Sequence, residues 1–522
     1  MNIAFFANIY CGKVSYLYIS YNIFMKRFFL SLMLVALTLT AAAQHDHHSK
    51  RRAQNSWRND YSSISSRKDV ESSILDLRLR RTGELDRQLL PEDRLHVTTL
   101  ILEGVVNDAD LRVIADLARR KTIISQGKEV KAFLNVDLEN VRYFNGDHEC
   151  DYLPESAFRD CKSLRSIVLP YRLREIGKSA FSGCSALEAV AMPDDLELIG
   201  RNAFYSCSSL TSIFIPDYVT EIPDEAFRSC SDLRKISLPE GLVTIGDNAF
   251  RATGLTAIDI PASVRTIGDN AFASAQIHTA IIPATVEHCA ANAFSSWHLM
   301  EFNVEEGNRE YCSVDGVLYS ADKHRLIVYP AGRTGSFVVP SFVTDINPGV
   351  FRSLTHLTSI EFECHITDIY DSMFEDCAGL TRVVLPEGVQ TIGKEAFRGC
   401  KALNTVQLPS SLRRIGVMAF RACKGMSYIE LPDGLEVIGE EAFDYCTHLA
   451  ELTLPATVRQ IGNKAFYNCD RMMQLVVLAP KPPVAEKLND NLKKIILKVP
   501  AGSGSAYTSS PAWGKFKNIQ EN

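Results

Sequence analysis

Cysteine is the residue whose number and spacing first suggest chemistry in this 522-residue chain. Of the fourteen cysteines, nine recur at steps of 23 residues in two groups: Cys161, Cys184, Cys207 and Cys230, then Cys377, Cys400, Cys423, Cys446 and Cys469. Thiols could form disulfides or bind a metal. Side by side in a parallel ladder, however, their Cβ atoms stay about 4.8 Å apart, beyond the ~3.8 Å of a disulfide. We therefore expect buried free thiols that serve as small hydrophobic side chains.

Other candidate sites for catalysis or metal binding are isolated. His45, His47 and His48 could bind copper or zinc, but nothing near this polar segment fixes a coordination geometry. Gly177-Lys178-Ser179 lacks the earlier glycine of a phosphate-binding loop. No carboxylates are spaced as an acid and base pair, and no serine-hydrolase or zinc-protease motif occurs. The sequence thus predicts no catalytic residue, no metal site and no cofactor, and we expect the protein not to be an enzyme.

Phenylalanine marks the repeat that contains these cysteines. Thirteen copies share the pattern C-x-x-L-x-x-I-x-L-P-x-x-V-x-x-I-G-x-x-A-F, as between Cys184 and Phe204. Their phenylalanines, spaced by 22 or 23 residues apart from one interruption, are Phe158, Phe181, Phe204, Phe227, Phe250, Phe272, Phe294, Phe351, Phe374, Phe397, Phe420, Phe443 and Phe466. Self-similarity at this period predicts a solenoid of stacked coils with one elongated interior.

Each recurring residue type has a physical role in the predicted coil. The alternation I-x-L suits a short parallel strand, and the following proline ends it because proline cannot donate the next ladder hydrogen bond. Glycine after isoleucine permits a tight or left-handed backbone, and A-F is predicted to form a single helical turn with phenylalanine in the core. The predicted fold class is a β-rich repeat solenoid of short parallel strands and single helical turns, with a cap at each end.

The N-terminal residues have the features of an export signal. A positive Lys26-Arg27 pair precedes an apolar run over 28–39, and the small residues 41–43 suit signal peptidase. We expect Met25 to be the true start, cleavage after Ala43, and no membrane span in the mature chain. Whether residues 1–24 are translated stays open.

The remaining chain divides by composition and pattern. We predict a disordered polar linker over 44–80, an N-terminal cap with a strand, a helix and a strand over 81–152, and coils over 153–300. A β-hairpin insertion over 301–336 follows, because two apolar runs flank the polar turn 320–324. Further coils occupy 337–478 and a C-terminal cap occupies 479–522. A net charge of -6 gives no basic footprint for nucleic acid.

The repeat resembles the BspA-like leucine-rich-repeat family, which is best represented in Bacteroidetes. The resemblance rests on C-x-x-L-x-x-I-x-L-P and I-G-x-x-A-F over 154–475, with S-V-D-G-V-L-Y in the insertion. It implies leucine-rich repeats of 22–23 residues and a secreted or surface protein that adheres to host matrix proteins, to other bacteria or to mucosal surfaces. The family has no common catalytic residues, so the resemblance implies none here.

A solenoid of this kind offers its outward strand positions to a ligand. The position between the strand isoleucine and leucine varies among copies, and the candidate contacts in this column are Phe214, Ile281, Val168, Asp259 and Glu430. We expect an exported monomer, extracellular or on the outer cell surface, with the periplasm left open. Its expected partner is extracellular matrix or a protein of a host or neighbouring cell surface. The alternative is a passive component of the envelope or matrix without a discrete ligand.

Overall fold

The computed structural model describes residues 73–120, 122–125, 128–489 and 492–522. The expected signal peptide and most of the expected linker lie outside these residues. The linker prediction is wrong at its end, because β1 (Ile74–Leu79) is a strand that pairs in parallel with β2 (Thr99–Val106). The inward positions of β1 are Leu75, Leu77 and Leu79. Charged side chains alternate with these leucines, so the sequence of the strand resembles that of a solvated segment.

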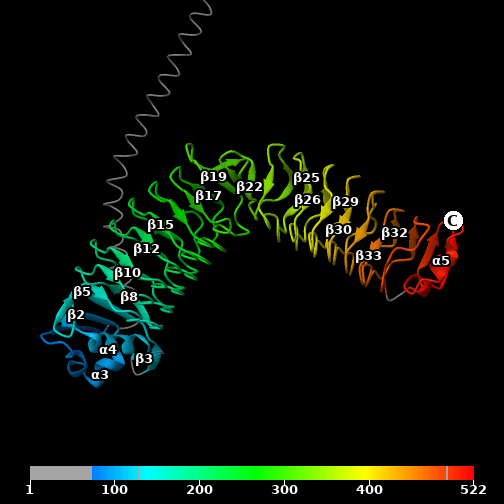
Figure 1. The fold of residues 1–522 in the computed structure, drawn as a ribbon. Coiled ribbons are helices and arrows are strands. Elements are labelled where there is room, and N and C mark those ends of the chain that lie inside the picture. Colours follow the sequence, from blue (N-terminus) through cyan, green and yellow to red (C-terminus); the bar gives the residue numbers. More distant parts are fainter. Residues whose placement is uncertain (1–72, 121, 126–127, 490–491) are drawn as a thin grey trace, which may run out of the picture. The chain divides into compact units, whose positions relative to one another are not determined.

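A small mixed region precedes the coils (Figure 1). Its long helix, α4 (Asp108–Ala118), begins after Asn107, whose side chain accepts hydrogen bonds from the Ala109 and Asp110 N–H groups. Leu111, Ile114 and Leu117 are buried on one face of this helix. The other elements are α2 (Leu85–Gln88), α3 (Pro91–His96), β3 (Thr122–Ser125), β4 (Lys128–Lys131), β5 (Leu134–Asn145) and β6 (His148–Cys150).

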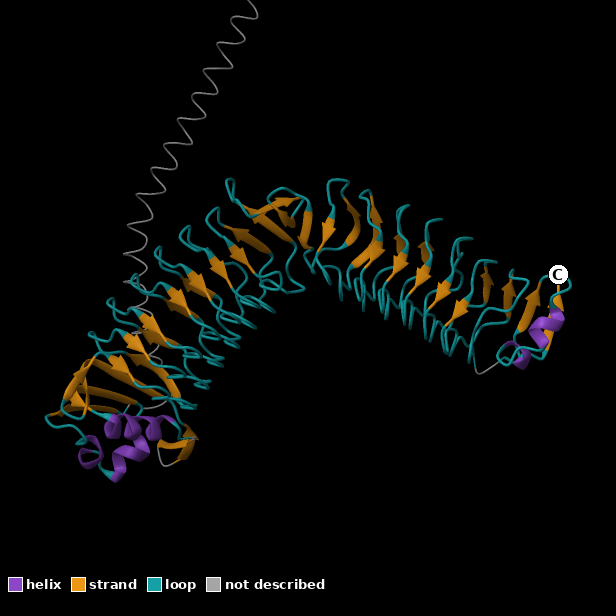
Figure 2. Cartoon of the chain, in the orientation of Figure 1, coloured by secondary structure: helices purple, strands orange, loops and turns teal. Residues whose placement is uncertain are grey.

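Each typical coil contributes a strand just before the repeat proline, and these strands follow one another in register (Figure 2). We call this series the first ladder. Its members are β8 (Leu164–Val168), β10 (Ala189–Ala191), β12 (Ser212–Phe214), β14 (Lys235–Ser237), β17 (Thr279–Ile282), β19 (Glu301–Val304), β23 (Gly335–Val339), β25 (Leu357–Phe362), β27 (Arg382–Val384), β29 (Thr405–Gln407), β32 (Glu451–Leu454), β34 (Gln474–Val477), β35 (Ile496–Val499) and β36 (Asn518–Glu521). This ladder confirms the solenoid of stacked parallel strands.

A second strand of two residues precedes the glycine position of most coils, and the repeat pattern alone does not predict it. This second ladder comprises β7 (Tyr152–Leu153), β9 (Glu175–Ile176), β11 (Leu198–Ile199), β13 (Glu221–Ile222), β15 (Thr244–Ile245), β16 (Thr266–Ile267), β18 (His288–Cys289), β24 (Asp345–Ile346), β26 (Asp368–Ile369), β28 (Thr391–Ile392), β30 (Arg414–Ile415), β31 (Val437–Ile438) and β33 (Gln460–Ile461). The glycine that follows lies close to the preceding coil: a Cβ at residue 200 would lie 2.4 Å from the Lys178 nitrogen. Close approach of two backbones, rather than a left-handed φ, therefore favours glycine here.

The A-F segments form consecutive hydrogen-bonded turns and not the helical turn that the sequence predicts. In the second coil, the Ala180 N–H donates to Gly177 and the Cys184 N–H donates to Phe181. Ser179, two residues before the phenylalanine, has a φ of 55°, which interrupts helical geometry. That left-handed residue turns its N–H toward the next coil, where the carbonyl of Arg201 accepts it at 2.9 Å. The backbone thus forms hydrogen bonds between coils instead of the hydrogen bonds of a helix.

The insertion is a three-stranded antiparallel meander rather than a simple hairpin. The two apolar runs recognised in the sequence form β21 (Val317–Ser320) and β22 (Arg325–Val328). A further strand, β20 (Tyr311–Val314), pairs with β21 across the tight turn at Asp315 and Gly316. The insertion joins the coils on both sides. Its strand β22 pairs in parallel with β24 of the following coils, and the Phe302 N–H of the preceding coil donates to the Gly316 carbonyl.

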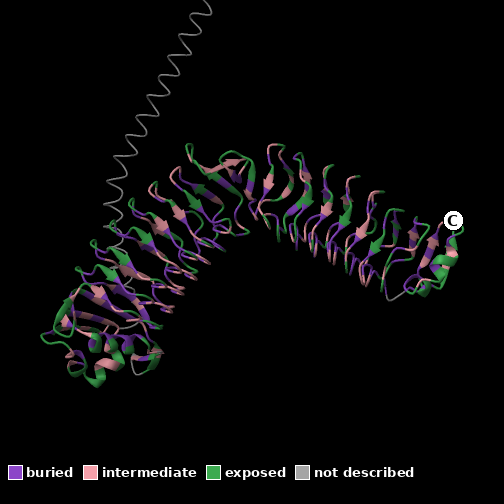
Figure 3. Ribbon diagram, in the orientation of Figure 1, coloured by how far each residue is buried: buried purple, intermediate pink, exposed green. Residues whose placement is uncertain are grey.

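Buried residues recur along the stacked coils (Figure 3), and most of them are apolar. The buried apolar side chains form two elongated clusters, one that ends at Leu318 and one that begins at Val317, rather than the single interior predicted. We call them the first core and the second core. The second core closes on α5 (Gly504–Thr508), the short helix η1 (Trp513–Lys515) and β36. Among the described residues, no helix combines the length and apolar character needed to cross a bilayer.

Candidate functional site

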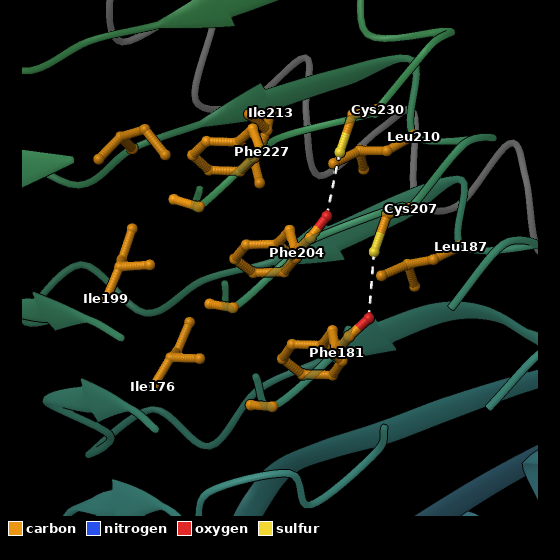
Figure 4. Packing of buried hydrophobic residues seen from close by; sticks show 14 of the residues in the cluster. Ile176, Phe181, Leu187, Ile199, Phe204, Cys207, Leu210, Ile213, Phe227 and Cys230 are labelled. Carbon is orange, nitrogen blue, oxygen red and sulfur yellow. Dashed lines mark hydrogen bonds between the residues drawn. The ribbon is translucent and has the colours of Figure 1, made fainter. Parts of the chain in front are cut away.

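A column of stacked phenylalanines supports the outward face from inside. Phe204 lies between Phe181 and Phe227, with ring centroids 5.2 and 5.3 Å away and nearly parallel planes (Figure 4). All three side chains are fully buried. Neighbouring coils are thereby held in one register, so the strand positions on the outside form regular columns.

The repeat cysteines add a second link between coils. The Cys207 thiol donates a hydrogen bond of 3.2 Å to the Phe181 carbonyl of the preceding coil, and Cys230 bonds Phe204 in the same way (Figure 4). The thirteen cysteines among the described residues are free thiols, which confirms the interpretation made from their spacing. Copies without cysteine carry Thr253, Ala275, Trp297 or Leu354, so packing at this position tolerates loss of the thiol.

Burial makes the thiols of the buried cysteines unreactive. It raises the pKa of Cys289, Cys377 and Cys469 to about 12, because desolvation disfavours the thiolate. At pH 8 the thiol, which is a poor nucleophile, therefore dominates. We expect a disulfide reagent to label only the half-buried Cys150 and Cys312 in folded residues 44–522. Complete labelling after unfolding is the control, and rapid labelling of the repeat cysteines in the folded protein would contradict the packing described here.

Three of the five predicted contact residues lie on the first ladder. Val168 ends β8 opposite Ala191, Phe214 ends β12 opposite Ser237, and Ile281 lies in β17 opposite Asn303. Val168 and Phe214 are half-buried, whereas Ile281 is 40% exposed. Among the five predicted contact residues, Ile281 is thus the apolar one that a partner can reach most fully.

Asp259 and Glu430 are exposed, but each lies in a coil whose first-ladder segment is not a regular strand. The structure therefore places the five residues along one repeat position without bringing them into a single pocket. Side chains that are neighbours in the column are 22 or 23 residues apart in sequence. The five residues lie in five different coils, of which the first contains β8. Such a surface suits an extended contact with a macromolecule more than enclosure of a small molecule.

Exposed tyrosines beside this column were missed by the sequence analysis. Tyr171 and Tyr218 follow the repeat proline by one and two residues and are 49% and 64% exposed. Tyr428 directly precedes the core Ile429 and is 59% exposed. Aromatic side chains are enriched in protein contacts. One sequence signal could have identified these tyrosines, namely an aromatic residue at a repeat position where other copies carry polar residues.

Ion pairs between successive coils line the outside of the stack. Arg165 in β8 pairs with Glu188 at 3.1 Å, and Arg382 in β27 pairs with Glu361 of the preceding strand at 3.1 Å. Glu375 is almost fully buried between Arg352 and Arg398, at 2.8 and 3.0 Å, and so links three coils. The two pairs at the first ladder leave the outward column with charged flanks of both signs.

The comparison with protein families agrees with this architecture. The family description "BspA type Leucine rich repeat region" matches six copies within residues 128–231, 197–313, 331–423 and 367–481. Among solved structures, a leucine-rich repeat protein of Bacteroides ovatus is 24% identical, with 72% of this chain and 87% of that chain covered and a TM-score of 0.41. A leucine-rich cell surface protein of Faecalibacterium prausnitzii is 22% identical, with 82% and 83% covered and a TM-score of 0.35.

The pneumococcal vaccine antigen PcpA is 19% identical, with 80% of this chain and 89% of that chain covered and a TM-score of 0.35. A search of curated proteins finds no match. The family description covers well over half of the sequence, in the part where the phenylalanine column and both ladders lie. This chain belongs to the BspA-type leucine-rich-repeat family.

Proposed function

We propose that this protein is exported and binds a protein of extracellular matrix or of a host or neighbouring cell surface through the outward column of its first ladder. The observation that carries the proposal is the in-register column itself, in which core positions stay fixed while the outward residue changes from coil to coil. Repeat proteins of this build recognise ligands by such variable exposed positions. Membership of a family of bacterial surface type supports export.

Recognition rather than catalysis fits the side chains on this face. Its exposed residues are apolar, amide and singly placed charged groups, and the described residues hold no cluster of three histidine, cysteine or acidic side chains that could bind a metal ion. General acid and base catalysis requires titratable groups within hydrogen-bond reach of one reacting atom. The first ladder instead spaces its charged groups along the stack and pairs several of them with the next coil.

Ile281 is the residue to change in a test of this proposal. Residues 44–522 are immobilised and exposed to surface proteins of host epithelial cells and of neighbouring bacteria, and the affinity of each captured protein is measured. We expect Ile281→Asp to raise Kd at least about tenfold, because a charge replaces an apolar contact near the middle of the interface. The side chain is 40% exposed, so the melting temperature should change little.

The matched control is Leu198→Asp. Leu198 lies in β11 of the second ladder and is 57% exposed, so this variant adds the same charge on a different face. We expect it to leave Kd unchanged. Equal loss of affinity in both variants, or in neither, would remove the assignment to the first ladder. Failure to capture any protein would favour a passive component of the envelope or matrix.

A further inference from the structure

The turn at Phe294 differs from the other twelve phenylalanine turns. In those turns the residues two before and two after phenylalanine have positive φ, and most of their N–H groups bond the next coil, as from Ser274 to the Ser295 carbonyl at 2.9 Å. Asn292 and Ser296 occupy these positions beside Phe294, and neither has a positive φ. The insertion separates this turn from that of Phe351, so the regular hydrogen-bonding partner is absent at this point among the described residues.

The phenylalanine column is also interrupted here. Phe272 and Phe294 stack at 4.8 Å, and the column resumes with Phe351 and Phe374 at 5.2 Å. Tyr329, just after β22, packs against the start of the second series, 5.8 Å from Phe351 and tilted by 56°. A cavity of about 390 Å³ remains between the two turns, a size within the usual range of small-molecule sites.

Two residues that line the cavity each carry a buried polar atom without a hydrogen-bond partner. These atoms are Oδ1 of Asn292 and the hydroxyl of Tyr329, and no other buried side-chain oxygen or nitrogen among the described residues lacks a partner. Tyr329 is 2% exposed. An unpaired buried polar group is rare because its desolvation is not compensated. Two of them around one cavity therefore point to a polar molecule that binds between them.

The wall also restricts the charge of that molecule. The charged residue in it is Arg352, whose guanidinium is paired with Glu375 at 2.8 Å. Burial raises the pKa of Tyr329 against the opposing effect of Arg333, so the phenol stays protonated at neutral pH and can donate a hydrogen bond. Oδ1 of Asn292 accepts one. The two atoms thus suit a neutral group that both donates and accepts, as a hydroxyl does.

The rim supplies a flat apolar surface. Trp297 lines the cavity and is 72% exposed, at the repeat position that nine other coils fill with buried cysteine. An indole left in solvent beside a polar cavity can pack on the C–H face of a sugar ring, whose hydroxyls then reach inward. An apolar peptide side chain would leave Asn292 and Tyr329 unpaired. We propose that this cavity binds a neutral saccharide unit through Trp297, Asn292 and Tyr329.

The test uses residues 44–522 labelled with 5-fluorotryptophan and followed by fluorine NMR. The probes are the methyl glycosides of N-acetylglucosamine, galactose and mannose, with N-acetylglutamine amide as a peptide-like probe. Trp297→Phe assigns the resonance of Trp297. We expect at least one glycoside to shift this resonance saturably at millimolar concentration, while the resonance of the fully buried Trp513 stays in place.

Tyr329→Phe distinguishes binding in the cavity from stacking on an exposed indole. It removes a hydroxyl that has no partner, so the fold should persist, and we expect Kd for the glycoside to rise about tenfold. Tyr428→Phe, at an exposed tyrosine, should change nothing. The proposal is overturned if no glycoside shifts the Trp297 resonance, if Tyr329→Phe binds as well as the parent, or if only the glutamine probe binds. None of these results bears on protein capture by the first ladder.

Discussion

Phe204→Ala should destabilise the first core by about 4 kcal/mol, the loss expected for a fully buried phenylalanine. Phe204 is 0% exposed and stacks on a ring from each neighbouring coil, so truncation removes contacts on both sides. Coils of a repeat array depend on their neighbours, so the effect should spread along the stack. Hydrogen exchange should therefore speed up over residues 154–304 and remain slow over 357–477, because the two cores divide at the insertion.

Leu198→Ala is the control in the adjoining segment. Leu198 is 57% exposed, and its truncation should change the free energy of unfolding by no more than about 0.5 kcal/mol. Faster exchange in both cores after Phe204→Ala would show that they unfold as one unit. An effect of Phe204→Ala as small as that of Leu198→Ala would contradict the tight column.

Trp513→Ala should have a comparable effect, about 4 kcal/mol, at the other end of the molecule. Trp513 is fully buried, packs against Tyr507 and Phe516, and donates from Nε1 to the Pro483 carbonyl at 2.8 Å. The Tyr507 hydroxyl donates to the Ala479 carbonyl at 2.7 Å, so both rings hold the proline-rich segment that leaves the last coil. Their loss should expose the end of the second core.

Trp297→Ala is the matched control for this substitution, because Trp297 is 72% exposed. We expect the control to change the free energy of unfolding by at most about 0.5 kcal/mol. Hydrogen exchange in Trp513→Ala should rise first in β34, β35 and β36 and leave the first core unchanged. Unaltered exchange in those strands would show that the C-terminal elements do not protect the array.

The repeat made most of the fold predictable from sequence. Phe204 and Cys207 recur at a fixed spacing, and only stacking buries such residues in every copy, so the interior and the free thiols follow. The second ladder was not predictable in this way, because a two-residue strand such as Glu221–Ile222 is too short to show a period. The turns were misread for a different reason. Ser179 adopts a left-handed φ only because its N–H finds an acceptor in the next coil.

The surfaces proposed for binding were predictable to a smaller extent. The pattern located the outward column, since Phe214 and Ile281 occupy a defined place between two core positions. It could not rank them, because exposure depends on how neighbouring side chains cover each residue. The cavity left no signal in the sequence. It arises where Tyr329 of the insertion meets the turn of Asn292, and the packing of an inserted segment is not encoded in the repeat.

Hydroxyl-radical footprinting of the complex with the captured surface protein tests the central claim most directly, because it reports on individual side chains. The proposed interface predicts that oxidation of Ile281 and Phe214 falls on binding, whereas Leu198 on the second ladder and Val484 near the C-terminal end stay as reactive as in the free protein. Protection of Leu198 with no change at Ile281 would contradict recognition through the first ladder.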